Sequence, residues 1–224
     1  MSKTYNILIV DDHPLIANAY KSAFDLVSSE NEEVDFNITI VENCDDAVEE
    51  IEEAVSNKKG IDIALLDISL PPSSDGKILS GEDLGTKLRK DIPTCKIVIS
   101  TTFNDNFRIQ VILKSVNPNG FLIKNDITKD ELIVAVKSIL EDTPYYSKSV
   151  LELFRKQNSV DYKLDKIDRQ LIYEMSIGTK MKDLPTIIPM SLAGLEKRKK
   201  QLKILFEADG DRELILKAKE KGFV

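Results

Sequence analysis

The sequence predicts an α/β fold in which a doubly wound parallel sheet of five strands precedes a small all-α domain. Three observations lead to this fold class. Five short apolar runs alternate with five stretches of helical apolar spacing, and only helical spacing recurs after residue 164. Parallel neighbours need crossover helices, which almost always turn right-handed. Of the common strand orders, the flavodoxin-like order 2-1-3-4-5 fits best and places the first and third strands side by side.

The composition is that of a soluble globular protein, because the 224 residues are 42% hydrophobic and 31% charged. No apolar run approaches the roughly 18 residues that span a bilayer, and the first residues lack the apolar region of a signal peptide. We therefore expect a cytoplasmic protein without a membrane partner. Cys44, Cys95 and His13 are too few for a disulfide framework or a Cys/His zinc site, and we interpret His13 as a structural loop residue.

Each predicted strand is a short apolar run that ends at turn residues, and each predicted helix repeats apolar residues at helical spacing. Pro14 suits the start of the first helix, and Thr128 with Glu131 forms a capping box at the fifth. Residues 71–80 are expected to form a loop. The strands cover residues 5–10, 36–41, 61–67, 96–100 and 121–123, and the helices cover residues 14–26, 45–55, 82–91, 106–115 and 128–140.

Polar residues stand where four of these strands end. Asp11 and Asp12 follow the first strand, Asp67 ends the third, and Thr101 and Lys124 follow the fourth and fifth. The carboxyl ends of strands build the site in an open α/β sheet, so these side chains are expected to converge. Taken singly, each of these residues also has a structural explanation. An aspartate can cap a turn, the threonine can be an ordinary strand residue, and the lysine can be a solvated side chain at a strand end.

Converging carboxylates repel one another by about 1 kcal/mol per pair at 4 Å in water, so they need a cation. Oxygen ligands alone select a hard ion, and we expect Mg²⁺, which also accepts phosphate oxygens. A carboxylate beside Mg²⁺ can accept a phosphoryl group as the nucleophile, here Asp67. Lys124 and the Thr101 hydroxyl would then bind the phosphoryl oxygens.

Charge divides the chain into two parts. Residues 164–224 hold 13 Lys and Arg against 10 Asp and Glu, a net +3, whereas the remainder holds 18 against 28, a net −10. Such an asymmetry suggests an acidic module joined to one that could meet a polyanion.

A boundary at residues 145–163, with room for a short helix at 149–156, precedes four predicted helices. They cover residues 167–177, 182–188, 191–206 and 211–221. Gly178 ends the first, Pro185 stands in the first turn of the second and Ser191 caps the third. Short helices and a tight turn before a basic helix indicate a helix-turn-helix. The basic residues available to DNA are Lys197, Arg198, Lys199, Lys200 and Lys203.

Residues 3–142 resemble the receiver domain of bacterial two-component response regulators. The motifs that carry the resemblance are Asp11-Asp12, Asp67-Ile68-Ser69-Leu70-Pro71, Thr101-Thr102 and Lys124. The resemblance implies that a sensor histidine kinase phosphorylates Asp67, and that Asp12, Asp67 and the Ser69 backbone carbonyl hold Mg²⁺ with help from Asp11. It also implies that Phe121 turns inward when Thr101 is drawn to the phosphoryl group. Unlike many family members, this chain has Asn125 after the lysine and an insertion at residues 73–80, after which Gly81 takes the place of the family's turn glycine.

Residues 164–224 resemble the LuxR-type helix-turn-helix domain of NarL-like regulators. The matching positions are Asp168-Arg169-Gln170, the Gly178 turn, Ser191 and residues 218–223. The usual Thr-Val-Lys-x-His after the serine is replaced, with Gly194 and Glu196 among the differences. Lys197, Arg198 and Lys200 carry over from the family, whereas Lys199 and Lys203 are phosphate contacts on charge alone.

The leading hypothesis is a transcriptional response regulator that is not an enzyme, with a receiver at residues 1–144, a linker at 145–163 and a DNA-binding domain at 164–224. Phosphorylation would change promoter DNA binding or favour a homodimer. The rival is an interaction module whose helix-turn-helix contacts a protein, which Gly194 and Glu196 favour. A phosphohydrolase is a third option, but the sequence shows no second catalytic domain or base.

Overall fold

A computed structural model describes residues 2–103, 105–155 and 164–224. The chain divides by its contacts into two units: residues 1–104 with 116–157, and residues 105–115 with 158–224. Among the helices in the described ranges, none is long and apolar enough to cross a membrane. The predicted domain boundaries remain a proposal, and residues 156–163 of the predicted linker lie outside the described residues.

The first unit contains a parallel sheet of six strands in the order β2-β1-β3-β4-β5-β6. The strands are β1 (Lys3–Val10), β2 (Val34–Val41), β3 (Ile63–Asp67), β4 (Lys96–Thr101), β5 (Gly120–Ile123) and β6 (Tyr145–Tyr146). The predicted order of the first five is confirmed, because β1 pairs with both β2 and β3. The sequence does not predict β6, since two residues are too few to show strand periodicity.

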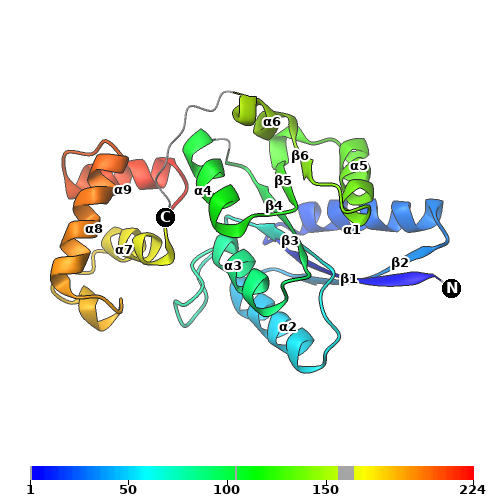
Figure 1. Cartoon of the computed structure of the whole chain (residues 1–224), viewed down its shortest axis with the longest axis horizontal. Coiled ribbons are helices and arrows are strands. Elements are labelled where there is room, and N and C mark those ends of the chain that lie inside the picture. The colour runs from blue at the N-terminus through cyan, green and yellow to red at the C-terminus, as the bar shows by residue number, and fades with distance from the viewer. Residues whose placement is uncertain (1, 104, 156–163) are drawn as a thin grey trace. The chain divides into compact units, whose positions relative to one another are not determined.

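Helices cover both faces of this sheet (Figure 1): α1 and α5 lie together on one face, and α2 and α3 on the other. The helices are α1 (Pro14–Glu30), α2 (Cys44–Ser56), α3 (Gly81–Asp91), α4 (Asn106–Val116) and α5 (Lys129–Leu140). Pro14 opens α1, and the Thr128–Glu131 capping box is present at α5, both as predicted. Residues 105–115, nearly all of α4, group with the second unit.

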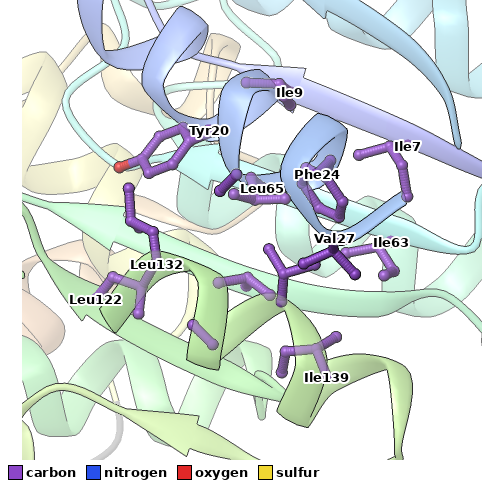
Figure 2. Close-up of a cluster of buried hydrophobic side chains, with 14 of the residues drawn as sticks. Ile7, Ile9, Tyr20, Phe24, Val27, Ile63, Leu65, Leu122, Leu132 and Ile139 are labelled. Atoms are coloured by element: carbon purple, nitrogen blue, oxygen red, sulfur yellow. The ribbon is translucent and has the colours of Figure 1, made fainter. Parts of the chain in front are cut away.

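The core on the α1 and α5 face joins side chains from alternate strand positions to one stripe of each helix. Figure 2 shows Ile7 and Ile9 of β1 with Phe24 of α1 and Leu132 of α5. Burying a side chain of this size stabilises the fold by about 1.5–3 kcal/mol. The packing fixes the strands relative to one another and so places their carboxyl ends at one edge.

The second unit contains α7 (Lys166–Ser176), α8 (Leu192–Leu205) and α9 (Asp211–Glu220). Among its side chains that are 0% exposed are Leu171, Leu195, Leu202, Leu214 and Ala218. Gly178, after α7, has a φ of +88°, and the Ser191 side chain caps α8, as predicted. The predicted helix at 182–188 is wrong: only the 3-10 turn η2 (Leu184–Thr186) forms. Pro185 lacks an N–H and Pro189 disfavours helical backbone at Ile188, so no full helix fits between them.

Asp126 links the end of β5 to α6 (Lys148–Arg155). As far as the structure describes it, α6 matches the short helix predicted at residues 149–156. Asp126 ends the 3-10 turn η1 (Lys124–Asp126), and its Oδ2 accepts a 2.7 Å hydrogen bond from the backbone N–H of Ser149 in the first turn of α6. This hydrogen bond lowers the pKa of the Asp126 carboxyl. The helix terminus is therefore capped by a residue that lies two positions after Lys124.

We expect Asp126→Ala to lower the free energy of unfolding by about 1 kcal/mol at neutral pH, as for other lost helix caps. The pKa of the Asp126 carboxyl is lower in the folded protein than the value of about 3.9 in the unfolded chain. The ionised cap therefore stabilises the fold fully above about pH 3.9, and this stabilisation is lost as the pH falls through the folded pKa. Urea unfolding at pH 7 and in the acid range measures the difference, which should shrink at acid pH. Asp126→Asn keeps an acceptor oxygen, so a loss as large as that of alanine would contradict the capping role.

Candidate functional site at the sheet edge

The sheet edge brings Asp11, Asp67 and Lys124 together. Asp67, the last residue of β3, and Asp11, directly after β1, are each 1% exposed. Lys124, the first residue of η1, places its Nζ 2.7 Å from Asp67 Oδ2 and 2.8 Å from Asp11 Oδ2. One ammonium group therefore bridges two buried carboxylates from adjacent strands.

Asp12 and His13 form the exposed side of this cluster. His13 Nδ1 lies 2.7 Å from Asp12 Oδ1, and the backbone N–H of His13 donates to Asp11 Oδ1 at 3.0 Å. Ser69 approaches from the other strand end, where its backbone N–H donates to Asp67 Oδ1 at 3.1 Å. The predicted loop residue His13 thus contacts both aspartates before it, and the Asp-Asp-His run was the only sequence signal for this.

Opposing influences act on the Asp67 carboxyl. Burial raises its pKa above the ordinary value and the nearby charge of Asp11 adds to the rise, while the hydrogen bonds from Lys124 and Ser69 act in the opposite direction. Asp11 Oδ2 is close to Lys124 Nζ, yet this buried oxygen has no hydrogen-bond partner of good geometry in the described part of the chain. The cluster therefore holds excess negative charge and an acceptor that a further cation could use.

The donor set fits the predicted Mg²⁺. Asp11, Asp12, His13 and Asp67 each offer a ligand atom, and these atoms lie within 4.8 Å of one another. Carboxylate oxygens are the ligands that a hard divalent ion prefers, and Asp11 Oδ2, which has Lys124 Nζ at 2.8 Å but accepts no hydrogen bond of good geometry in the described residues, keeps acceptor capacity for it. Ligation by these residues, and by the Ser69 carbonyl, stays a prediction.

Thr101 and Phe121 lie next to this cluster on β4 and β5. Both are 0% exposed, and the Thr101 Oγ1 accepts a hydrogen bond from the Phe103 N–H at 3.1 Å. In the sheet register Ile99 pairs with Phe121 and Thr101 pairs with Ile123. The two predicted switch residues are therefore within one strand pair, and their movement stays a prediction.

The long loop after Asp67 returns to it at Gly81, the first residue of α3. Within the loop the backbone N–H of Ser74 donates to both carboxylate oxygens of Asp45 at 3.0 Å, which ties the loop to α2. A Cβ added at Gly81 would lie 1.8 Å from the backbone carbonyl oxygen of Asp67. The glycine that follows the insertion is thus required by its contact with the backbone of the central aspartate.

The basic run of α8 is partly used inside its own unit. Arg198 Nη1 lies 2.7 Å from Asp165 Oδ2 and 2.9 Å from the buried Asp168 Oδ1. Lys199 Nζ is 3.0 Å from Glu196 Oε2, and Lys203 Nζ is 2.5 Å from Asp211 Oδ1. Lys199 Nζ also lies 3.5 Å from Asp211 Oδ2. Three of the five predicted DNA contacts are therefore already paired with carboxylates, of which Asp165, Asp168 and Asp211 lie outside α8 and Glu196 lies on it.

Lys197 and Lys200 remain on the exposed surface of α8, and neither has an ion pair within the described ranges. They are three residues apart, so they share one face of the helix. Gly194, which replaces a larger residue of the resembled family, has a packing reason: a Cβ there would lie 2.8 Å from Met190 Cγ. The unpaired positive charge of α8 is thus concentrated in these two lysines.

Comparison with known protein families finds one family model, described as the response regulator receiver domain, which matches residues 7–137. The oxygen regulatory protein NreC of Staphylococcus epidermidis is 26% identical over 159 residues, which cover 69% of this chain and 65% of that protein. NreC of Staphylococcus aureus is 24% identical over 139 residues, which cover 62% of this chain and 56% of that protein. The chain thus matches somewhat less than two thirds of the length of these relatives.

Solved structures of similar fold cover nearly the whole chain. RcsB of Salmonella enterica serovar Typhimurium, bound to promoter rprA in the presence of the phosphomimetic BeF₃⁻, matches with a TM-score of 0.67 and 17% identity over 96% of this chain and 98% of that one. The same protein bound to promoter P1flhDC matches with a TM-score of 0.60 and 18% identity, over 99% of this chain and 100% of that one. At such identities the likeness extends to the fold, a receiver-like sheet followed by a helical unit.

Proposed function

Because this chain belongs to the response regulator receiver family, we propose that Asp67 accepts a phosphoryl group from a sensor histidine kinase and that the phosphorylated chain controls transcription through residues 164–224. The observation that carries the proposal is the pairing of Lys124 Nζ with Asp67 Oδ2 at 2.7 Å and with Asp11 Oδ2 at 2.8 Å. A cation held between two buried carboxylates is already placed to meet the charge of a phosphoryl group.

In the transfer step, an Asp67 carboxylate oxygen forms a bond to phosphorus, and the bond from phosphorus to the imidazole nitrogen of a phosphohistidine breaks. The nitrogen keeps the bonding electron pair. Lys124 and Thr101 would bind the equatorial oxygens. Asp12, Asp67 and the Ser69 backbone carbonyl, with help from Asp11, would hold Mg²⁺, which when bound supplies positive charge against the phosphoryl oxygens. The side chain of Asp67 is held for attack by the N–H of Ser69.

For the output of the signal, we propose DNA contact through Lys197 and Lys200. The support is their exposure and their freedom from the ion pairs that hold Arg198, Lys199 and Lys203. The RcsB chains of similar fold are bound to promoter DNA. In this arrangement Arg198 acts mainly to attach α8 to the start of α7, and phosphate contacts come from the unpaired lysines.

We expect the double variant Lys197→Ala/Lys200→Ala to weaken binding to promoter fragments by at least tenfold at low salt and to reduce the salt dependence of binding, because two phosphate contacts are lost. Gel shifts across a salt series measure both effects. Lys219→Ala on α9 is the matched control, since it removes one exposed charge from another helix. Wild-type affinity in the double variant would refute DNA contact through this face.

One observation favours the rival in which α8 meets a protein. Leu192 is 41% exposed and Ile204 is 71% exposed near opposite ends of the same helix, which also carries the acidic Glu196. Exposed apolar side chains would contribute to a protein contact without phosphate-binding lysines. Two results together would favour this alternative. The phosphorylated wild type would give no gel shift at low salt, and it would capture a protein partner in a salt-insensitive way that Ile204→Ala abolishes.

A further inference from the structure

The inference concerns a pair of hydroxyl groups buried beneath the sheet edge, and it rests on the proposed phosphorylation of Asp67. Tyr20 of α1 is 3% exposed and Ser100 of β4 is 0% exposed. The Tyr20 hydroxyl is hydrogen-bonded to Ser100 Oγ across 80 residues of sequence. Figure 2 shows the Tyr20 ring among the labelled side chains of the core cluster.

Burying two hydroxyl groups at this position costs free energy, so their presence needs an explanation. The surrounding core cluster is otherwise hydrophobic, and burying a hydroxyl costs about 1–3 kcal/mol unless its hydrogen bonds are replaced. The mutual hydrogen bond of Tyr20 and Ser100 offsets this cost, and replacing both partners by apolar groups of the same shape can be nearly neutral or stabilising. Overall stability alone therefore does not require a tyrosine and a serine that meet here.

Ser100 is attached directly to the phosphoacceptor strand. It pairs with Asp67 in the β3–β4 register, and its backbone carbonyl accepts a 3.2 Å hydrogen bond from the Ile68 N–H. The next residue is Thr101, whose hydroxyl belongs to the site. Tyr20 in turn lies on the helix that follows Asp11 and Asp12. The hydroxyl pair thus joins the helix after the acidic pair to the strand that carries Thr101 and flanks Asp67.

The electrostatics agree with this placement. Burial raises the pKa of the Tyr20 hydroxyl above its usual range, the hydrogen bond to Ser100 opposes the rise, and the charges of Asp11 and Asp67 add to it. The hydroxyl is therefore protonated at neutral pH and close enough to feel both carboxylates. It remains a neutral hydrogen-bonding group while the charge of the site changes.

We propose that Tyr20 is a positioning residue for phosphoryl transfer, acting through Ser100 to hold the carboxyl ends of β3 and β4 in the geometry from which Asp67 reacts. Without this hydrogen bond the end of β4 loses its attachment to α1, and Thr101 and the backbone after Asp67 are less well placed. Small misplacements of reacting groups slow a reaction even when binding is unchanged.

The test is a double-mutant cycle of Tyr20→Phe and Ser100→Ala in the full chain. Phosphorylation by acetyl phosphate with Mg²⁺ is followed by mass spectrometry of the intact protein. Each single variant should lower the rate constant about five- to tenfold, equivalent to about 1–1.4 kcal/mol, with the Mg²⁺ concentration for half-saturation unchanged. The double variant should be no slower than either single variant, since both remove the same bond.

Tyr145→Phe is the matched control, because Tyr145 packs against the same core from β6; its rate constant should stay at the wild-type value. Urea unfolding is measured for every variant. Wild-type rate constants with a lowered unfolding midpoint would show a purely structural bond and overturn the proposal, as would additive losses in the double variant. A wild-type protein that takes up no phosphoryl group would instead refute the proposed function.

Discussion

Asp67→Asn is expected to abolish uptake of a phosphoryl group from acetyl phosphate and binding of beryllofluoride with Mg²⁺. The amide has nearly the same volume as the carboxyl but lacks the nucleophilic oxygen, so no acyl phosphate can form. The loss should be complete rather than partial, because Asp11 and Asp12 lie on a different strand end and do not carry the N–H contact that Ser69 makes to Asp67. Mass spectrometry of the intact protein measures the uptake of the phosphoryl group, and ¹⁹F NMR measures the binding of beryllofluoride.

Asp75→Asn is the control for this experiment. Asp75 lies in the loop that follows Asp67 and pairs with Lys77 at 2.9 Å on the surface, so its substitution removes one carboxylate from the same segment. We expect wild-type uptake in this variant. Equal uptake by the Asp67 variant and the wild type would place the phosphoacceptor elsewhere and would leave the proposed function without its central residue.

Gly81→Ala is expected to produce the largest loss of stability among single substitutions at the sheet edge. A Cβ at this position would lie 1.8 Å from the Asp67 carbonyl oxygen and 2.8 Å from its carbonyl carbon. Both are backbone atoms, so a side-chain rotation cannot relieve the overlap, and either α3 or the end of β3 must move. We expect the free energy of unfolding to fall by about 3 kcal/mol or more, in the range of severe packing and strain defects.

Urea unfolding measures this loss of stability. Any Gly81→Ala protein that folds should also be phosphorylated more slowly, because the displaced backbone belongs to Asp67. Gly210→Ala is the control, since a Cβ there meets nothing within 4 Å and the backbone φ of −138° suits any residue. The control should cost less than about 1 kcal/mol, the usual scale of an N-cap change. A Gly81 variant as stable as the control would show that α3 can shift freely away from β3.

Sequence patterns were sufficient for most of the elements and for the set of side chains that meet at the sheet edge. Apolar runs located β1 to β5, and a proline and a capping box located the starts of α1 and α5. The strand order placed Asp11, Asp67 and Lys124 at one edge. These features follow from residues that are neighbours along the chain or from the general rule that parallel strands end together. The wrong prediction of a helix at residues 182–188 also has a local cause, because Pro185 lies within this segment and Pro189 directly follows it.

Which charged and polar side chains meet one another was decided by the tertiary structure. A run of basic residues on α8 suggests DNA contact for all five, yet Arg198 binds Asp165 and Asp168, which precede it by 33 and 30 residues. Tyr20 and Ser100 each look like ordinary core or strand residues until the fold joins them. Periodicity reports which face of an element is buried, whereas a partner is fixed only when distant segments come within hydrogen-bonding distance, and that distance depends on the packing of the whole unit.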